Sequence, residues 1–106
     1  MIARTWRGRA TAAKADDYHR HFTTEVVPNL KRIAGHKGAY LLRRDVEDGV
    51  EFLAVTLWDS LETIKKFSGP DPEVAHIEPV GRAALFDFDE FARNYEIVVN
   101  TAGDKA

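Results

Sequence analysis

The sequence predicts one α+β domain of the ferredoxin-like type, with two helices packed on one face of a four-stranded antiparallel sheet. The order of apolar periods along the chain is strand, helix, strand, strand, helix, strand, which is the βαββαβ plan. A length of 106 residues allows one core and not two. Cysteine is absent, so packing alone must hold the fold. We expect the domain to span residues 1–100 and residues 101–106 to form a flexible tail.

Residues 2–10 alternate in character and predict the first strand. After Thr11, a plausible N-cap, apolar residues recur every three or four positions, which predicts a helix that stops at Gly35. Pro28 has no N–H to donate, so this helix should kink or break near Val27. The apolar stripe consists of Ala15, Tyr18, Phe22, Val26, Leu30 and Ile33.

Two histidines flank this stripe. At about 100° per residue, His19 lies roughly 40° from the centre of the stripe and His21 roughly 120° away. We therefore expect His19 at the edge of the buried face and His21, between Asp17 and Glu25 at i−4 and i+4, in solvent.

Residues 38–44 and 50–58 read as two strands of a hairpin, joined by residues 45–49 with Asp48-Gly49 in the turn. The second strand is apolar on both faces, so both faces need cover. The helices supply only one layer. We therefore expect a homodimer in which the bare sheet faces of two copies meet.

Asp59 and Ser60 are placed to cap a second helix, whose apolar residues are Leu61, Ile64 and Phe67. Gly69-Pro70 ends that helix.

The last third of the chain is less regular. Residues 72–77 predict a short helix, after which Pro79 and Gly81 interrupt the chain. Residues 83–91 fit a helix or an extended chain, and residues 93–100 predict the last strand.

Several classes of function are disfavoured by composition. A formal charge of −2 and a sequence pI near 6.1 lack the basic excess that nucleic-acid binding needs. The apolar runs are short, and Arg4, Arg7 and Arg9 stand where a signal peptide would need its apolar segment. We expect a cytoplasmic protein without membrane contact.

Catalytic motifs of the common hydrolases and nucleotide enzymes are also missing. Ser60 and Ser68 are the only serines and occupy cap or turn positions, and no Gly-rich phosphate loop occurs. The four histidines show no spacing that would build a metal cage, so we expect no metal.

Four stretches carry a resemblance to a known family. They are MIARTWRGR, GAYLLRR to EFLAVTLWDSLETIKKF, HIEPVGRAALFDFDEF and NYEIVV, which together cover residues 1 to about 100. In these stretches the chain resembles the antibiotic biosynthesis monooxygenase superfamily of dimeric α/β-barrel proteins. The strand that ends in Trp-Asp-Ser and runs directly into an amphipathic helix is the most specific part.

The resemblance implies a pocket in each subunit between the sheet and its own helices. In the family such a pocket takes a flat aromatic substrate, which is oxygenated without flavin or metal. The haem-degrading branch uses an Asn, a Trp and a His. Trp6 or its neighbour Arg7, Phe67 and His76 stand at those positions here, so one of the three residue types is retained.

His76 and His19 are the candidate catalytic residues, as groups that move a proton. Each could equally be a structural histidine of a helix surface. The candidate substrate-binding residues are Arg4 for an oxyanion and an aromatic wall of Trp6, Phe22, Trp58 and Phe67. Core packing is the alternative for the aromatic residues, and an ion pair with Glu51 or Glu96 is the alternative for Arg4.

Three functions follow in order of preference. The first is cofactor-independent oxygenation of a quinol-type or other aromatic small molecule. The second is a non-catalytic module that binds a small hydrophobic ligand, for instance in a stress response. The third is haem binding or degradation, with His76 as the axial ligand.

Overall fold

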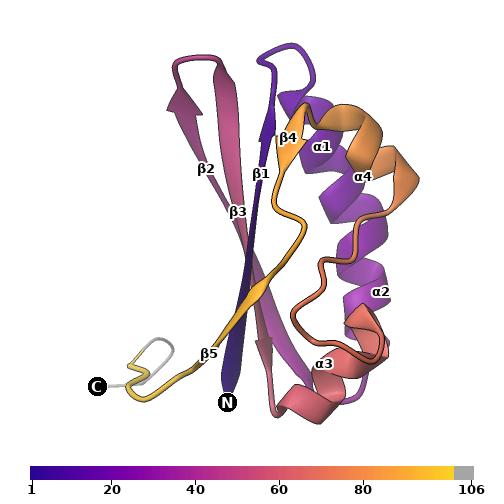
Figure 1. Cartoon of the computed structure of the whole chain (residues 1–106), viewed down its shortest axis with the longest axis vertical. Coiled ribbons are helices and arrows are strands. Elements are labelled where there is room, and N and C mark those ends of the chain that lie inside the picture. Colours follow the sequence, from indigo (N-terminus) through magenta and orange to yellow (C-terminus); the bar gives the residue numbers. More distant parts are fainter. Residues whose placement is uncertain (102–106) are drawn as a thin grey trace.

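All helices lie on one face of an open antiparallel sheet, and the other face of the sheet is bare (Figure 1). This computed structural model describes residues 1–101, so the predicted tail lies, from residue 102 on, outside the described residues. The strands are β1 (Ile2–Ala10), β2 (His36–Val46), β3 (Gly49–Trp58), β4 (Asp87–Phe88) and β5 (Arg93–Glu96). The helices are α1 (Ala15–His21), the π-helical turn η1 (Phe22–Val26), α2 (Val27–Lys31), α3 (Leu61–Ser68) and α4 (Pro79–Ala84).

The strand order confirms the ferredoxin-like prediction. It is β2-β3-β1, with β4 and β5 both paired antiparallel to the outer edge of β1. The last strand expected over residues 93–100 is shorter, because β5 ends at Glu96, and the additional strand β4 forms within residues 83–91. β4 pairs with Gly8 and Arg9, and β5 pairs with residues 2–5 of β1.

Register decides which residues of the sheet meet the helices. Alternate residues of β3 are buried, and they are Val50, Phe52, Ala54, Thr56 and Trp58. The residues between them, including Leu53, Val55 and Leu57, are half-buried on the bare face. Their neighbours on β2 are open to solvent, because Tyr40 is 53% exposed and Leu42 is 49% exposed. The prediction of a central strand that is apolar on both sides is confirmed.

The first helix forms later than expected and changes type at Pro28. Lys14 is its N-cap, while Thr11 only accepts a turn hydrogen bond from the Lys14 N–H. A proline ring crowds the carbonyl four residues earlier, which the wider π-helical turn η1 relieves. Pro28 then sits in the first turn of α2, where its missing N–H costs nothing. The expected kink or break near Val27 takes the form of a change from π- to α-helical hydrogen bonding at that residue, and the chain stays helical.

The second helix is as predicted, with Ser60 accepting a hydrogen bond from the Thr63 N–H at 3.2 Å. The helix predicted over residues 72–77 is wrong. The backbone groups of this segment are engaged with distant residues: the Ala75 N–H donates to Glu90 O, and Val74 forms a bridge with Phe91. A helix forms instead at Pro79–Ala84, because proline is tolerated in a first turn.

Residues 90–92 leave the sheet between β4 and β5 and pair with residues 73–75. The Ala92 N–H donates to Glu73 O at 2.8 Å, opposite the bond from Ala75 to Glu90 at 3.0 Å. The stretch 83–91 is thus part helix and part extended chain. This detour pins the segment between α3 and α4 against the edge of the sheet, where Figure 1 shows it crossing between the sheet and the helices.

In the described residues, no helix has the length and apolar character needed to cross a lipid bilayer.

The β2–β3 turn supplies a test of the packing. Gly49 has φ +149°, and a Cβ added there would lie 2.2 Å from the Ala10 carbonyl oxygen. Gly69 also has a positive φ, +90°, but its Cβ would meet open space. Gly69→Ala should cost about 1–3 kcal/mol through backbone strain. Gly49→Ala should cost at least about 1 kcal/mol more, because the β1 backbone must also move. Urea denaturation measures both; equal losses would contradict this close approach.

Candidate functional site

A cavity lies between the sheet and the helices, and three walls enclose it. The sheet supplies Arg4, Trp6, Ala54 and Thr56; α1 and η1 supply Tyr18, His21, Phe22 and Val26; the opposite side supplies Phe67, His76, Ile77, Glu78 and Gly81. The enclosed space is about 50 Å³, and the hollow measures about 590 Å³ when its open mouth is included. The enclosed volume is well below the roughly 150 Å³ of a closed cavity that accommodates a benzene ring. A ring would therefore extend into the mouth.

Arg4 brings a buried arginine side chain into the wall of this cavity. It is 4% exposed, and its guanidinium donates to Val74 O at 2.7 Å and to Pro72 O. It makes no ion pair with any carboxylate within residues 1–101, so the ion-pair alternative with Glu51 or Glu96 is wrong. Burial lowers the pKa of Arg4 to about 10. A buried cation without a counter-charge favours an anion in the cavity beside it.

Glu51 is instead engaged on the bare face of the sheet. It accepts from Arg44 at 2.8 Å and from Arg7 at 3.2 Å. Glu51 and Arg4 point to opposite faces because they occupy alternating positions of the same paired strands.

Trp6 lines the cavity and does not fill it. Its Nε1 donates to Asp89 O at 2.7 Å, where the chain begins its detour out of the sheet. The ring lies over Gly8, where an added Cβ would come within 3.0 Å of it. Its centroid is 6.3 Å from that of Tyr18 and 6.4 Å from that of Phe88. These contacts fix the ring as one side of a planar slot.

The positions of the two helix histidines are reversed from the sequence prediction. His21 is 5% exposed and lines the cavity, whereas His19 is exposed to solvent. The prediction failed because it considered only the burial of the first helix against the sheet. α4 packs beside α1, and Gly81 lies so close to His21 that an added Cβ would be 3.1 Å from Nε2. This second contact extends the buried face of α1 to His21.

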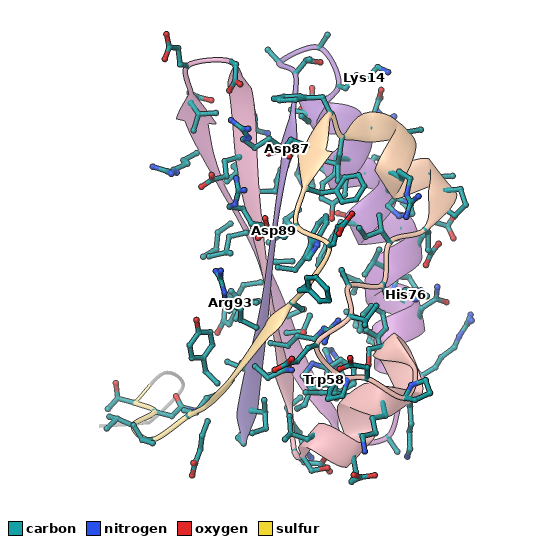
Figure 2. All side chains as sticks on the ribbon, viewed as in Figure 1. Lys14, Trp58, His76, Asp87, Asp89 and Arg93 are labelled. Atoms are coloured by element: carbon teal, nitrogen blue, oxygen red, sulfur yellow. The ribbon has the colours of Figure 1, made fainter. Side chains whose placement is uncertain are left out.

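His76 lies on the segment between α3 and α4, in extended chain and not on a helix (Figure 2). Its ring is exposed and packs against Phe67, with centroids 4.8 Å apart. The Phe67 ring in turn lies 5.9 Å from the Arg4 guanidinium carbon. The structure thus brings together Arg4, Trp6, Phe22, Phe67 and His76 from the predicted site.

Two predicted site residues lie outside the cavity. Trp58 is fully buried at the α3 end of the sheet, packed with Leu30 and Ile64, and its Nε1 donates to Thr56 Oγ1 at 2.8 Å. His19 lies beside a shallow groove between η1 and β2.

The sequence prediction missed eight cavity residues, which are Tyr18, His21, Val26, Ala54, Thr56, Ile77, Glu78 and Gly81. Tyr18 belongs to the apolar stripe predicted for the first helix. The stripe of one helix cannot show that α4 covers the side of that helix. The signal for α4 was the Pro79-x-Gly81 pattern, since proline fits a first turn and glycine permits close helix contact.

Among residues 1–101 no three His, Asp or Glu side chains gather in a way that could hold a metal ion. The cavity chemistry is therefore that of a largely apolar, aromatic slot with one buried cation, one buried imidazole and one buried phenol. Burial raises the pKa of the Tyr18 hydroxyl above its usual range, so this phenol is a neutral group at ordinary pH.

The fold is shared with solved structures of known proteins. A candidate antibiotic biosynthesis monooxygenase from Bacillus cereus matches with a TM-score of 0.68 and 16% identity, over 99% of this chain and 98% of that one. A variant of MhuD, with two manganese protoporphyrin IX molecules per active site, gives 0.67 and 17%, over 94% and 97%. SnoaB from Streptomyces nogalater, a cofactor-independent oxygenase, gives 0.65 and 13%, over 93% and 94%.

No protein-family profile and no curated protein sequence matches the chain. The resemblance to antibiotic biosynthesis monooxygenases is confirmed in the fold. At these identities it identifies neither substrate nor cofactor.

The buried phenol of Tyr18 predicts a pH dependence. In the unfolded chain the pKa of Tyr18 has the ordinary tyrosine value of 10.0, and in the folded chain the hydroxyl stays neutral to higher pH. Its contribution to stability is therefore full below pH 10 and is lost as pH rises beyond that value. Between pH 8 and 11 the expected loss from Tyr18 is about 1.4 kcal/mol, taken as the difference between the wild type and Tyr18→Phe, because Arg4, whose pKa is lowered to about 10, contributes a change of the opposite sign over this range.

Urea denaturation at the two pH values measures this loss. Tyr18→Phe should remove it, whereas Tyr40→Phe, on the exposed face of β2, should leave it in place. The same change in stability between the two pH values in the wild type and in Tyr18→Phe would mean that the hydroxyl is hydrated.

Proposed function

We propose that this protein, which has the fold of the antibiotic biosynthesis monooxygenase structures, oxygenates a planar, electron-rich aromatic molecule without an organic or metal cofactor. The observation that carries the proposal is the cavity between sheet and helices, with aromatic walls and a buried, uncompensated Arg4. The substrate class is a phenol, hydroquinone or anthrone, because such molecules offer a flat face to Trp6 and an oxyanion to Arg4.

The chain's contribution is to desolvate, orient and hold charge. Phe22, Phe67 and Trp6 keep water from the ring and fix its plane. The guanidinium of Arg4 stabilises negative charge on the substrate oxygen, and this interaction is strong because the group is shielded from solvent. An electron-rich anion then reacts with O2. For an anthrone, one CH2 becomes C=O and one water leaves per O2 consumed.

The dimensions of the cavity support one position of the ligand. The enclosed part is too small for a ring, and the mouth is bordered by Phe67, His76 and Glu78. We propose that the oxygenated edge of the ligand enters toward Arg4 and the rest of the ring lies against Phe67. His76 is then a contact at the mouth, where its exposed ring meets both ligand and water.

The cavity does not fit a haem in this form. A porphyrin is several times larger than the single ring that already needs about 150 Å³. The one histidine at the predicted axial position, His76, is stacked on Phe67 at the rim. We therefore assign no step to haem. A ligand-binding module without turnover is the alternative that the next experiment separates.

Oxygen uptake with a panel of hydroquinones and anthrones tests the proposal. The wild type should consume O2 with at least one of them, and Arg4→Gln should lower kcat/KM about 10- to 100-fold by removing the cation near the oxyanion. Arg32→Gln, on the exposed end of the first helical segment, is the matched loss of an arginine and should have little effect.

Ligand binding is followed in parallel by quenching of tryptophan fluorescence. Binding without O2 consumption for every compound would favour the binding module. Absence of both would overturn the aromatic site. The fold of Arg4→Gln is checked by circular dichroism, since Arg4 also holds Pro72 and Val74.

The bare face of the sheet favours a homodimer. Leu42, Leu53, Val55 and Leu57 form a contiguous apolar surface on β2 and β3, with Leu42 directly opposite Leu53. Salt bridges from Arg7 and Arg44 to Glu51 border it. We propose that a second copy covers this surface face to face, since one symmetric contact buries both copies.

Light scattering at micromolar concentration tests the dimer. The wild type should give twice the 11.9 kDa of one chain. Leu53→Glu should give the monomer mass, because it places a charge at the centre of the contact. Lys31→Glu, on the exposed helix layer, should not. A wild-type mass near 12 kDa would refute the contact.

A further inference from the structure

We propose that the Tyr18 hydroxyl donates a hydrogen bond to an uncharged oxygen of the ligand, while Arg4 holds the ionisable oxygen at the other end of the cavity. The inference rests on the aromatic-ligand site proposed above. It deepens that function by adding a residue that selects the ligand, because a ligand of this site then carries a second acceptor oxygen besides its hydroxyl group.

The hydroxyl of Tyr18 has no partner in the protein. It makes no hydrogen bond to any of residues 1–101. The fully buried side-chain atoms that lack a partner in this part of the chain are His21 Nδ1, His36 Nδ1 and Asn94 Oδ1, and the Tyr18 oxygen is not one of them. Although Tyr18 is only 5% exposed, its hydroxyl oxygen therefore keeps some accessible surface.

This accessible surface faces the cavity. Tyr18 borders the cavity between the sheet and the helices, and it borders neither the surface groove between α1 and α4 nor the one between η1 and β2. The ring is packed elsewhere, with centroid distances of 5.0 Å to Phe52, 6.3 Å to Trp6 and 6.5 Å to Phe22. Gly81 covers one ring edge, since a Cβ there would lie 3.6 Å from Tyr18 Cε1. The hydroxyl is thus the part of Tyr18 that a ligand can reach.

The Tyr18 hydroxyl acts as a donor. Burial raises the pKa of Tyr18 above its usual range, so the hydroxyl keeps its proton. The aromatic neighbours hold the ring, and rotation about the C–O bond is the freedom that remains. In a largely apolar cavity this donor gains a hydrogen bond when a ligand supplies an acceptor oxygen.

The strand register places Arg4 and Tyr18 at different ends of the cavity. Arg4 and Trp6 are consecutive inward-facing residues of β1, and Phe52 on β3 belongs to the next row beyond Trp6. Tyr18 packs on Trp6 and Phe52, whereas the Arg4 guanidinium extends the other way, toward Phe67 of α3. A ligand that lies over the Trp6 indole therefore has the cation beyond one edge and the phenol beyond the other.

The other polar side chains of the cavity wall suit an uncharged ligand oxygen less well. The Thr56 hydroxyl accepts from Trp58 Nε1 at 2.8 Å, which holds it on the α3 side. The Glu78 carboxylate accepts hydrogen bonds and does not donate them. His76 is exposed at the mouth, where water competes for its nitrogens. Tyr18 is the shielded neutral donor on the α1 side.

The test uses 4-hydroxyacetophenone and 4-ethylphenol, which share a phenol ring and differ by one carbonyl oxygen. Each is titrated into the full chain at a pH below the phenol pKa of both probes, and quenching of tryptophan fluorescence gives Kd. Infrared absorption of 4-hydroxyacetophenone, isotope-labelled at its carbonyl carbon, reports the contact directly. A hydrogen bond to the carbonyl lowers its stretching frequency.

Tyr18→Phe keeps the packed ring and removes only the hydroxyl. It should weaken binding of 4-hydroxyacetophenone about 3- to 10-fold and leave that of 4-ethylphenol within about 2-fold. The carbonyl frequency of the bound probe should rise. Tyr40→Phe, on the exposed face of β2, should change none of these values. Because each variant is compared with the wild type on the same probe, the different acidity of the two probes cancels.

Two results would overturn the inference. An unchanged carbonyl frequency in Tyr18→Phe, with both probes affected alike, would mean that the hydroxyl does not meet the ligand. A frequency that rises in Arg4→Gln but not in Tyr18→Phe would assign the carbonyl to Arg4. In both cases 4-ethylphenol still binds the wild type, so the aromatic site stands. If neither probe binds the wild type, the proposed function fails first and this inference fails with it.

Discussion

The hydrogen bonds from Arg4 to the carbonyls of Pro72 and Val74 join the sheet to the segment that closes the cavity. Arg4 is on the strand at the centre of the sheet topology, and the segment belongs to the far half of the chain. A guanidinium is suited to this link because its fork can donate to two carbonyls at once while its flat face lies near Phe67. The link also leaves a buried positive charge without a carboxylate, which is the main electrostatic feature of the cavity.

The edge of the sheet supports the same segment from the other side. Between β4 and β5 the chain leaves β1 at residues 90–92 and pairs with residues 73–75. Trp6 lies beside the start of this detour, where its indole N–H donates to the carbonyl of Asp89. One irregularity in the last strand therefore fixes the aromatic wall and the mouth of the cavity together.

The helix layer sets the remaining wall. Gly81 allows α4 to approach α1 so closely that His21 is buried, and the π-helical turn at Phe22–Val26 brings the chain past Pro28 without ending the helical layer. The bare face of the sheet carries the opposite character, with apolar residues at its centre and salt bridges around Glu51 at its border. The two faces of the sheet therefore differ: the helices and one face enclose a cavity, whereas the other face presents apolar residues to solvent.

The sequence by itself determined the element order, the doubly apolar central strand and the β2–β3 hairpin, because these follow from local periodicity and turn chemistry. It also placed Arg4, Trp6, Phe22 and Phe67, since strand parity and helix stripe assign each to an inward or outward side, whereas His76 came from the family resemblance. Only the tertiary structure decided the burial of His21, the extended path of residues 72–77 and the short strand β4 ahead of a shortened last strand. Each of these depends on partners distant in sequence: α4 for His21, Arg4 and residues 90–92 for the segment, and Trp6 for the detour. The periodicity of one element shows which of its own faces is apolar. Burial and backbone pairing also depend on the elements that pack against its other faces.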